Sequence, residues 1–189
     1  MRIIAGYVKG MPLAVPRRGV RPTSDRTRAA IFSSLGERVM GARVLDLFAG
    51  TGALGLEAAS RGATDVTFVE SAPDALETLE GNVAEFVKRL CGAGSGHPIL
   101  QIQRGDVANE LARLAAAKER FQVIFADPPY GAEAQALLAD EMLPGLLSDG
   151  GVLVLESSKR DMVLAREPWE LFRGSTYGDT RVDFCRAKL

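Results

Sequence analysis

The chain has 189 residues, 47% of them hydrophobic and 25% charged, which is the composition of one soluble globular domain. Two distant cysteines and a single histidine exclude a disulfide framework and leave too few ligands for a zinc site, so we expect no metal. We expect neither a signal peptide nor a membrane span, because no apolar run approaches the roughly 20 residues that a span needs, and we therefore expect a cytoplasmic protein.

The N-terminal end is the most basic part of the sequence. Residues 1–30 contain seven arginines and lysines and one acid, so this segment has a charge of +6 although the whole chain has −1. Residues 2–16 read as two short strands of a hairpin, 17–24 as a basic loop, and Ser24 can cap a helix over 25–38. We interpret residues 1–24 as an extension that meets a polyanion, with an ordinary solvated surface as the alternative.

Residues 25–189 form the second predicted unit, in which apolar strands alternate with helices. Strands are predicted at 43–48, 65–70, 99–106, 121–127 and 151–157, with helices at 53–62, 72–90 and 107–118. Two more strands near the C-terminus are joined by a turn at 177–179. This alternation predicts an α/β fold with a seven-stranded, mostly parallel sheet, helices on both faces and an antiparallel C-terminal hairpin.

A glycine-rich loop follows the first of these strands. Gly50, Gly52 and Gly55 match the G-x-G-x-x-G pattern of dinucleotide-binding proteins, and Glu70 stands close to 20 residues further on. By this pattern alone, a nicotinamide-dependent oxidoreductase is a reasonable interpretation.

Acids at the ends of four strands favour a different ligand. Carboxylates repel the pyrophosphate of a dinucleotide, whereas S-adenosylmethionine has no phosphate and carries a cationic sulfonium and ammonium that suit Asp46. Glu70 can accept hydrogen bonds from the ribose hydroxyls, and Asp106 can accept one from the adenine amine beside the Val107 N–H. Taken singly, Asp46 could instead hold the glycine loop and Asp106 could cap the following helix. The fourth acid, Asp127, begins a motif of its own.

The motif Asp127-Pro128-Pro129-Tyr130 ends the fourth strand. An exocyclic amine on a nucleobase is a poor nucleophile, because its lone pair is delocalised into the ring. Asp127 can accept one of its N–H bonds and the Pro128 carbonyl the other, and the two prolines keep these acceptors rigid. Tyr130 offers a ring on which an unpaired or flipped-out base can stack.

The set "VLDLFAGTGALG", "VTFVE", "GDV" and "DPPY" resembles Rossmann-like S-adenosylmethionine-dependent methyltransferases, and D-P-P-Y resembles the signature of those that methylate exocyclic amines. With "MRIIAG", "RRGVRPTSDRTRAAIFSSL" and "YGDT", nearly the whole chain resembles the RsmD family of 16S ribosomal RNA guanine-N2 methyltransferases. The resemblance implies methylation of one guanine on an assembled or assembling 30S particle. We expect the protein to be a monomer.

The resemblance also assigns residues. It implies a cofactor pocket of Asp46, Phe48, Ala49, Gly50, Gly52, Glu70, Asp106 and Val107, catalytic residues Asp127, Pro128, Pro129 and Tyr130, and RNA contacts by Arg17, Arg18, Arg21, Thr23 and Arg26. Arg21 or Arg26 could instead lie beside the cofactor pocket. An adenine-N6 or cytosine-N4 DNA methyltransferase and a non-catalytic RNA-binding protein remain alternatives, although 189 residues leave no room for a separate DNA-recognition domain.

Overall fold

The computed structural model describes residues 1–16, 23–93, 97–129, 131–161 and 166–188. Its helices are α1 (Asp25–Leu35), α2 (Ala53–Ser60), α3 (Pro73–Ala93), α4 (Val107–Ala116) and α5 (Gly131–Leu138), with short 3-10 helices at Gly36–Val39 and Pro144–Leu146. Its strands are β1 (Arg43–Leu47), β2 (Asp65–Glu70), β3 (Ile99–Arg104), β4 (Phe121–Ala126), β5 (Leu147–Ser158), β6 (Trp169–Tyr177) and β7 (Thr180–Ala187).

These strands form one seven-stranded sheet in the order β3-β2-β1-β4-β5-β7-β6. The first five strands are mutually parallel, and β7 runs antiparallel to both β5 and β6. The predicted mostly parallel sheet with an antiparallel C-terminal hairpin is therefore confirmed. The strand order reverses between β1 and β4, and open α/β sheets bind ligands at the carboxyl ends of the strands beside such a reversal.

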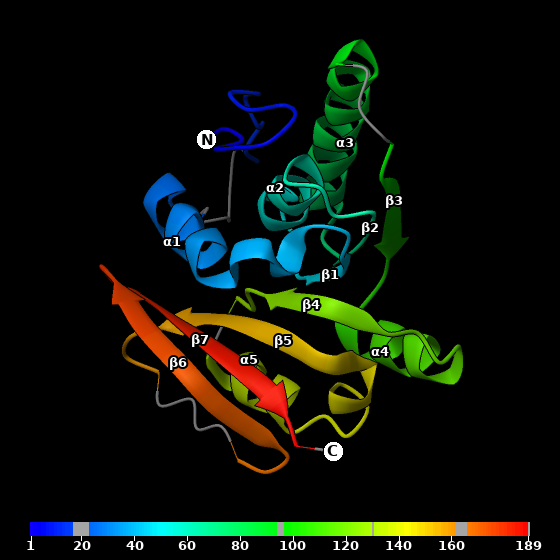
Figure 1. The fold of residues 1–189 in the computed structure, drawn as a ribbon. Helices are drawn as coiled ribbons and strands as arrows, with labels where there is room; N and C mark the ends of the chain where they lie inside the picture. The colour runs from blue at the N-terminus through cyan, green and yellow to red at the C-terminus, as the bar shows by residue number, and fades with distance from the viewer. Residues whose placement is uncertain (17–22, 94–96, 130, 162–165, 189) are drawn as a thin grey trace.

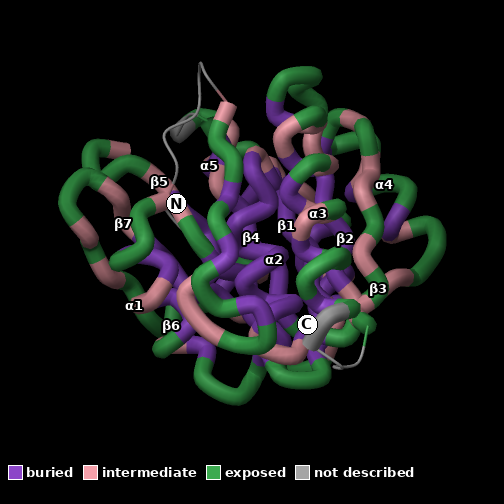
Figure 2. The backbone as a smooth tube through the Cα atoms, turned by 90° about the horizontal axis from the view of Figure 1, so that it is seen from above, coloured by how far each residue is buried: buried purple, intermediate pink, exposed green. Residues whose placement is uncertain are grey.

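Helices cover both faces of the sheet, as Figure 1 shows. The N-terminal segment, α1, α2 and α3 pack on one face, in a core that includes Phe32, Phe68 and Phe125. Helices α4 and α5 pack on the other face, in a core that includes Leu111 and Leu153. Seen from above in Figure 2, the buried residues gather in the middle of the molecule, along β1, β4 and α2.

The N-terminal segment is part of the first core. The predicted hairpin is a turn closed by one antiparallel bridge between Arg2 and Pro12 rather than two regular strands. Its apolar residues Ile3 and Met11 are fully buried, and the carboxylate of Glu57 on α2 accepts hydrogen bonds from the Ile4 and Ala5 N–H groups at 2.6 and 3.1 Å. Because this segment covers its outer side, α2 is buried along its whole length.

Ser24 begins α1 as predicted, since its side chain accepts a hydrogen bond from the Thr27 N–H. The helix ends earlier than predicted, at Leu35, because Gly36 adopts a positive φ of 58° and the chain continues as a 3-10 turn. Among the residues that the structure describes, no helix combines the length and the apolar character that crossing a membrane requires.

Candidate active site

Four carboxylates line one face of the sheet at the carboxyl ends of four adjacent strands. Side chains alternate between faces along a strand, so Asp46 on β1 and Glu70 on β2 share the face of the Phe68 side chain. By the same alternation, Asp127 directly after β4 and Glu156 on β5 lie on this face, beneath α1 and α2. The register pairs Ala126 with Leu155, which makes Asp127 and Glu156 direct neighbours.

Glu156 is the member of this row that the sequence analysis did not identify. The Glu156 side chain is only 2% exposed, in a strand whose other buried residues are those of an ordinary apolar core. A usable signal was present in the sequence, because Glu156 ends the apolar run of the fifth strand just as Glu70 ends that of the second. With Glu156 included, the two strands at the switch point, β1 and β4, each have a carboxylate at or just after their carboxyl end. So do their outer neighbours, β2 and β5.

The glycine loop between β1 and α2 adopts the tight turn that its sequence predicts. Gly50 and Gly52 have positive φ angles of 56° and 74°, and Phe48 has a φ of 57°, which is uncommon for a bulky residue. The loop is closed by a hydrogen bond of 2.7 Å from the Gly52 N–H to the Ala49 carbonyl. Backbone strain of this kind clusters at ligand-binding sites, which supports the assignment of Phe48 to the cofactor pocket.

Glu70 accepts a hydrogen bond from this loop, and Asp46 accepts one from the first turn of α2, which follows the loop. Asp46 Oδ2 accepts one from the Gly55 N–H at 2.8 Å, and Glu70 Oε2 accepts one from the Gly50 N–H at 2.8 Å. Asp106 caps α4, since its Oδ1 accepts a hydrogen bond from the Ala108 N–H at 2.9 Å. The structural roles that the sequence left open for Asp46 and Asp106 are thus real, and ligand contacts by the same residues remain predictions.

Thr23, which the resemblance places among the RNA-contact residues, contacts two carboxylates of the row in the structure. Its hydroxyl oxygen lies 3.4 Å from Asp127 Oδ2 and 3.1 and 3.2 Å from Glu156 Oε1 and Oε2. The sequence separations are 104 and 133 residues, so no local pattern could have revealed these contacts. The end of the basic N-terminal loop therefore meets the predicted catalytic carboxylate directly.

Burial dominates the electrostatics of the row. It raises the pKa of Asp46 to about 8, opposed by the Gly55 N–H and reinforced by the charges of Asp127 and Glu70. Burial also raises the pKa of Asp127 to about 6, against the hydrogen bond from Thr23. The pKa of Glu156 is raised well above its usual range, first by burial and then by the charge of Asp127. Perturbed carboxyl groups gathered at one sheet edge are typical of a functional site.

The remaining predicted site residues are divided between described and undescribed parts of the chain. Pro128 is buried and Pro129 exposed, so the backbone after Asp127 leaves the core at this point. Arg26 is exposed on α1. Tyr130 and the three remaining RNA-contact residues, Arg17, Arg18 and Arg21, lie outside the described residues.

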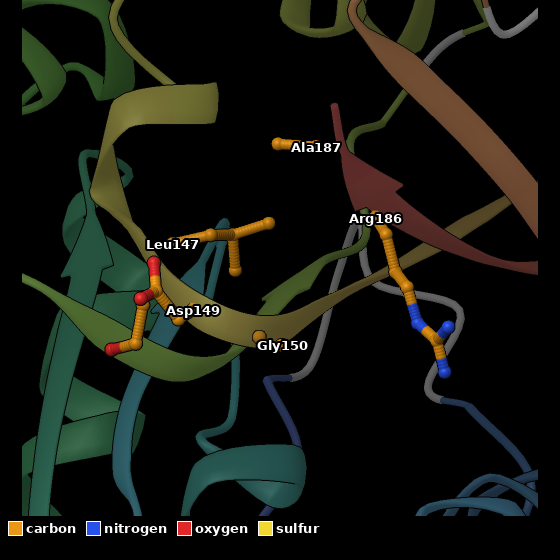
Figure 3. Close-up of a pocket in the computed structure, with 7 residues that line it drawn as sticks. Leu147, Asp149, Gly150, Arg186 and Ala187 are labelled. Atoms are coloured by element: carbon orange, nitrogen blue, oxygen red, sulfur yellow. The ribbon is translucent and has the colours of Figure 1, made fainter. Parts of the chain in front are cut away.

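One cavity in the structure lies away from this row. It has a volume of about 300 Å³ and is lined by Leu147, Asp149, Gly150 and Arg186 among others. These residues lie at the start of β5 and the end of β7. The cavity is therefore at the opposite end of the strands from Asp127, which follows the carboxyl end of β4. In Figure 3 the Arg186 side chain extends away from Asp149, so the two charged groups do not converge on a common ligand.

The residues of the row fit a cationic ligand and do not fit a dinucleotide. Asp46 is 2% exposed and lies at the base of the glycine loop, where a pyrophosphate would meet a buried acid. The loop itself, residues 48–55, contains no lysine or arginine. Among the described residues, no three His, Cys, Asp or Glu side chains are grouped so as to hold a metal ion.

The fold and this row of carboxylates define the class of Rossmann-like S-adenosylmethionine-dependent methyltransferases. The structure is similar to that of "Putative methyltransferase yhhF" from Escherichia coli, with a TM-score of 0.81, 28% identity and coverage of 100% of this chain and 99% of the other. A hypothetical protein of Thermus thermophilus has the same TM-score of 0.81 at 34% identity, over 99% of each chain.

The chain belongs to the family described as conserved hypothetical protein 95, whose model matches residues 1–186. It is 36% identical to YlbH of Bacillus subtilis strain 168, provisionally named an rRNA methyltransferase, over 96% of each chain. It is 33% identical to ribosomal RNA small subunit methyltransferase D of Escherichia coli K12, over 94% of this chain and 85% of the relative. The family resemblance that the sequence motifs carried is therefore confirmed.

Proposed function

We propose that this protein transfers a methyl group from S-adenosylmethionine to the exocyclic N2 amine of a guanine in 16S ribosomal RNA. The substrate is the 30S subunit or its assembly intermediate, and the protein acts in the cytoplasm as a monomer. One observation carries the proposal. Asp127 and the rigid prolines after it stand at the switch point of the sheet, next to the strand that bears Asp46 and the glycine loop. The names of the relatives support ribosomal RNA as the substrate.

Asp127 and Pro128 would hold the amine. The carboxylate accepts one N–H and the Pro128 carbonyl accepts the other, which draws the nitrogen toward tetrahedral geometry and frees its lone pair. With a pKa of about 6, Asp127 is mostly ionised at neutral pH and so available as an acceptor. The prolines limit the motion of both acceptors, so little ordering remains for the reacting complex.

The other carboxylates would hold the cofactor. S-adenosylmethionine supplies an electrophilic methyl group on a sulfonium. Asp46 and Glu70 would offer negative charge to its cationic groups and acceptors to its ribose, while Asp106 and Val107, just after the end of β3, would bind its adenine. Phe48, Ala49, Gly50 and Gly52 would form the wall of the same pocket.

Residues 1–24 would contact the RNA, together with Arg26. The charge of +6 over residues 1–30 favours a polyanion, and Thr23 brings the end of this segment to Asp127. RNA that is bound along the basic segment would therefore be delivered to the catalytic carboxylate.

The substrate can be tested by mass mapping of methyl groups. We expect 30S particles from cells that lack the gene to be missing one N2-methylguanine, and the purified protein with S-adenosylmethionine to restore it. Duplex DNA serves as the competing substrate. Methylation of DNA, or of an adenine or cytosine amine in the particle, would overturn the assignment.

A further inference from the structure

We propose that Thr23 and Glu156 are positioning residues for Asp127: Glu156 carries a proton and donates it to the Thr23 hydroxyl, and Thr23 donates its own proton to the Asp127 carboxylate. The chain of donors keeps Asp127 ionised and fixes its orientation. The inference rests on the proposed function for the role of Asp127, but the arrangement of protons belongs to the free protein and can be measured there.

The geometry places one hydroxyl between two carboxyl groups. Thr23 Oγ1 lies 3.1 and 3.2 Å from the two oxygens of Glu156 and 3.4 Å from Asp127 Oδ2. Thr23 precedes α1, whereas the two acids end neighbouring strands on the face that α1 covers. A threonine hydroxyl can donate one hydrogen bond and accept up to two, so it can bridge a donor and an acceptor.

The number of protons decides the arrangement. If both carboxyl groups were ionised, the single Thr23 proton could serve only one of them, and the other would be a buried anion beside an oxygen lone pair. One additional proton on either acid gives every group in the chain a partner. Glu156 is only 2% exposed, whereas Asp127 is half-buried, so the cost of ionisation is greater for Glu156 and it takes the proton.

Two charged groups around Glu156 act in opposite directions. From α1, the fully buried Arg28 favours an ionised Glu156, but part of its charge is offset by Asp25, because its Nη2 pairs with that carboxylate at 2.7 Å and donates to the Arg2 carbonyl at 2.6 Å. Among the described residues, its Nε and Nη1 have no hydrogen-bond partner. From β1, Asp46 disfavours an anion at Glu156 when it is itself ionised, which its raised pKa of about 8 restricts to alkaline pH.

The direction of each pKa is consistent with the same picture. Burial and the neighbouring acids raise the pKa of Glu156 well above its usual range, while the hydrogen bond from Thr23 opposes the effect of burial on both Glu156 and Asp127. Asp127 therefore remains the more acidic of the two groups.

The test is a 13C carboxyl NMR titration of the free protein, in which Asp127→Asn and Glu156→Gln identify the two signals by their loss. We expect the Glu156 carboxyl to remain protonated at pH 6, where Asp127 is about half ionised. Thr23→Val removes the hydroxyl at nearly constant size, so we expect the Asp127 pKa to rise by about 0.5 to 1 unit because its ionised form loses a donor. Thr23→Ser keeps the hydroxyl and should restore the wild-type value.

Glu156→Gln is the decisive second variant. The glutamine amide can replace the carboxyl proton as donor to Thr23, so we expect the Asp127 pKa to stay within about 0.3 units of the wild-type value. A fall in the Asp127 pKa would mean that Glu156 is an anion in the wild-type protein, and an unchanged Asp127 pKa in Thr23→Val would mean that Thr23 does not position it. Either result overturns the inference, whereas inactive wild-type protein with the expected titrations overturns only the proposed function.

Discussion

Asp46 is a predicted ligand-binding residue whose burial lowers the free energy of unfolding as the pH rises. Its carboxyl is 2% exposed, and burial raises its pKa from an ordinary 3.8 to about 8. The folded state therefore binds a proton more tightly than the unfolded state between these two values. The contribution of this group to stability is fully present below about pH 4 and is lost as the pH rises toward 8. A bound cationic ligand would reverse the free-energy cost of ionising Asp46, because it stabilises the ionised carboxylate.

We predict that Asp46→Asn stabilises the free protein at neutral and alkaline pH while weakening cofactor binding. The asparagine carbonyl can still accept the Gly55 N–H, and it does not ionise. The difference in melting temperature between the variant and the wild type should grow from pH 5 to pH 8 and reach at least about 2 °C, the shift that about 1 kcal/mol produces in a domain of this size.

The matched control is Asp149→Asn, an exposed aspartate at the opposite end of the strands. Its melting temperature should follow that of the wild type across the same range. A difference for Asp46→Asn that shrinks as the pH rises would contradict the burial of an unfavourable charge at this position.

At the scale of elements, the strands and helices followed from the sequence, and the contacts between distant segments did not. Period and turn residues located the strands β1 to β5 and the terminal hairpin, because each depends on neighbouring residues. The bond from Thr23 to Asp127 depends on how α1 lies over β4 and β5, which no short window of sequence contains. The sequence shows Glu156 at the end of an apolar run, but its position beside Asp127 depends on the register between β4 and β5.

The glycine loop gives a prediction about two glycines with opposite requirements. A Cβ on Gly52 would lie 2.5 Å from Leu79 Cδ1, and its φ of 74° is unfavourable for alanine, whereas a Cβ on Gly81 in α3 would meet nothing within 4 Å. Gly52→Ala should lower the melting temperature by roughly 2 to 8 °C and weaken cofactor binding. Gly81→Ala should raise the melting temperature slightly, because alanine stabilises the interior of a helix by about 0.5 to 1 kcal/mol relative to glycine, and should leave binding unchanged.

Thermal melting and calorimetry with S-adenosylhomocysteine check both glycine variants. Equal melting temperatures for the two would contradict the loop geometry described above.

For the whole molecule, the fold brings the basic N-terminal segment and the acidic site onto one side of the sheet. Four acids stand at the switch point between β1 and β4, and Thr23, at the end of the N-terminal segment, contacts one of them, Asp127. The amino-acid sequence alone showed that residues 1–30 are basic and that the rest of the chain is acidic. The placement of both charged regions on the face covered by α1 and α2 required the structure, because it depends on the packing of residues 1–16 against α2.

This arrangement predicts that the salt dependence of RNA binding comes from basic residues on the face of the sheet that α1 covers. Arg26→Ala on α1 should reduce the slope of log affinity against log salt by about one, as expected when one phosphate contact is lost. Arg113→Ala, on α4 across the sheet, is the control and should leave the slope unchanged. Equal slopes for wild type and Arg26→Ala would remove Arg26 from the RNA interface.

The central claim is that Asp127 holds the target amine, and single-turnover methyl transfer by Asp127→Asn tests it most directly. The variant keeps the size of the side chain but loses the charge and one acceptor. Labelled S-adenosylmethionine, 30S particles and mass mapping of the product measure the rate and the methylated atom, and calorimetry measures cofactor binding. The account predicts a loss of at least about 100-fold in rate, near 2.7 kcal/mol of barrier, with cofactor affinity within about threefold of the wild type. A variant that still methylates guanine N2 at close to the wild-type rate would contradict it.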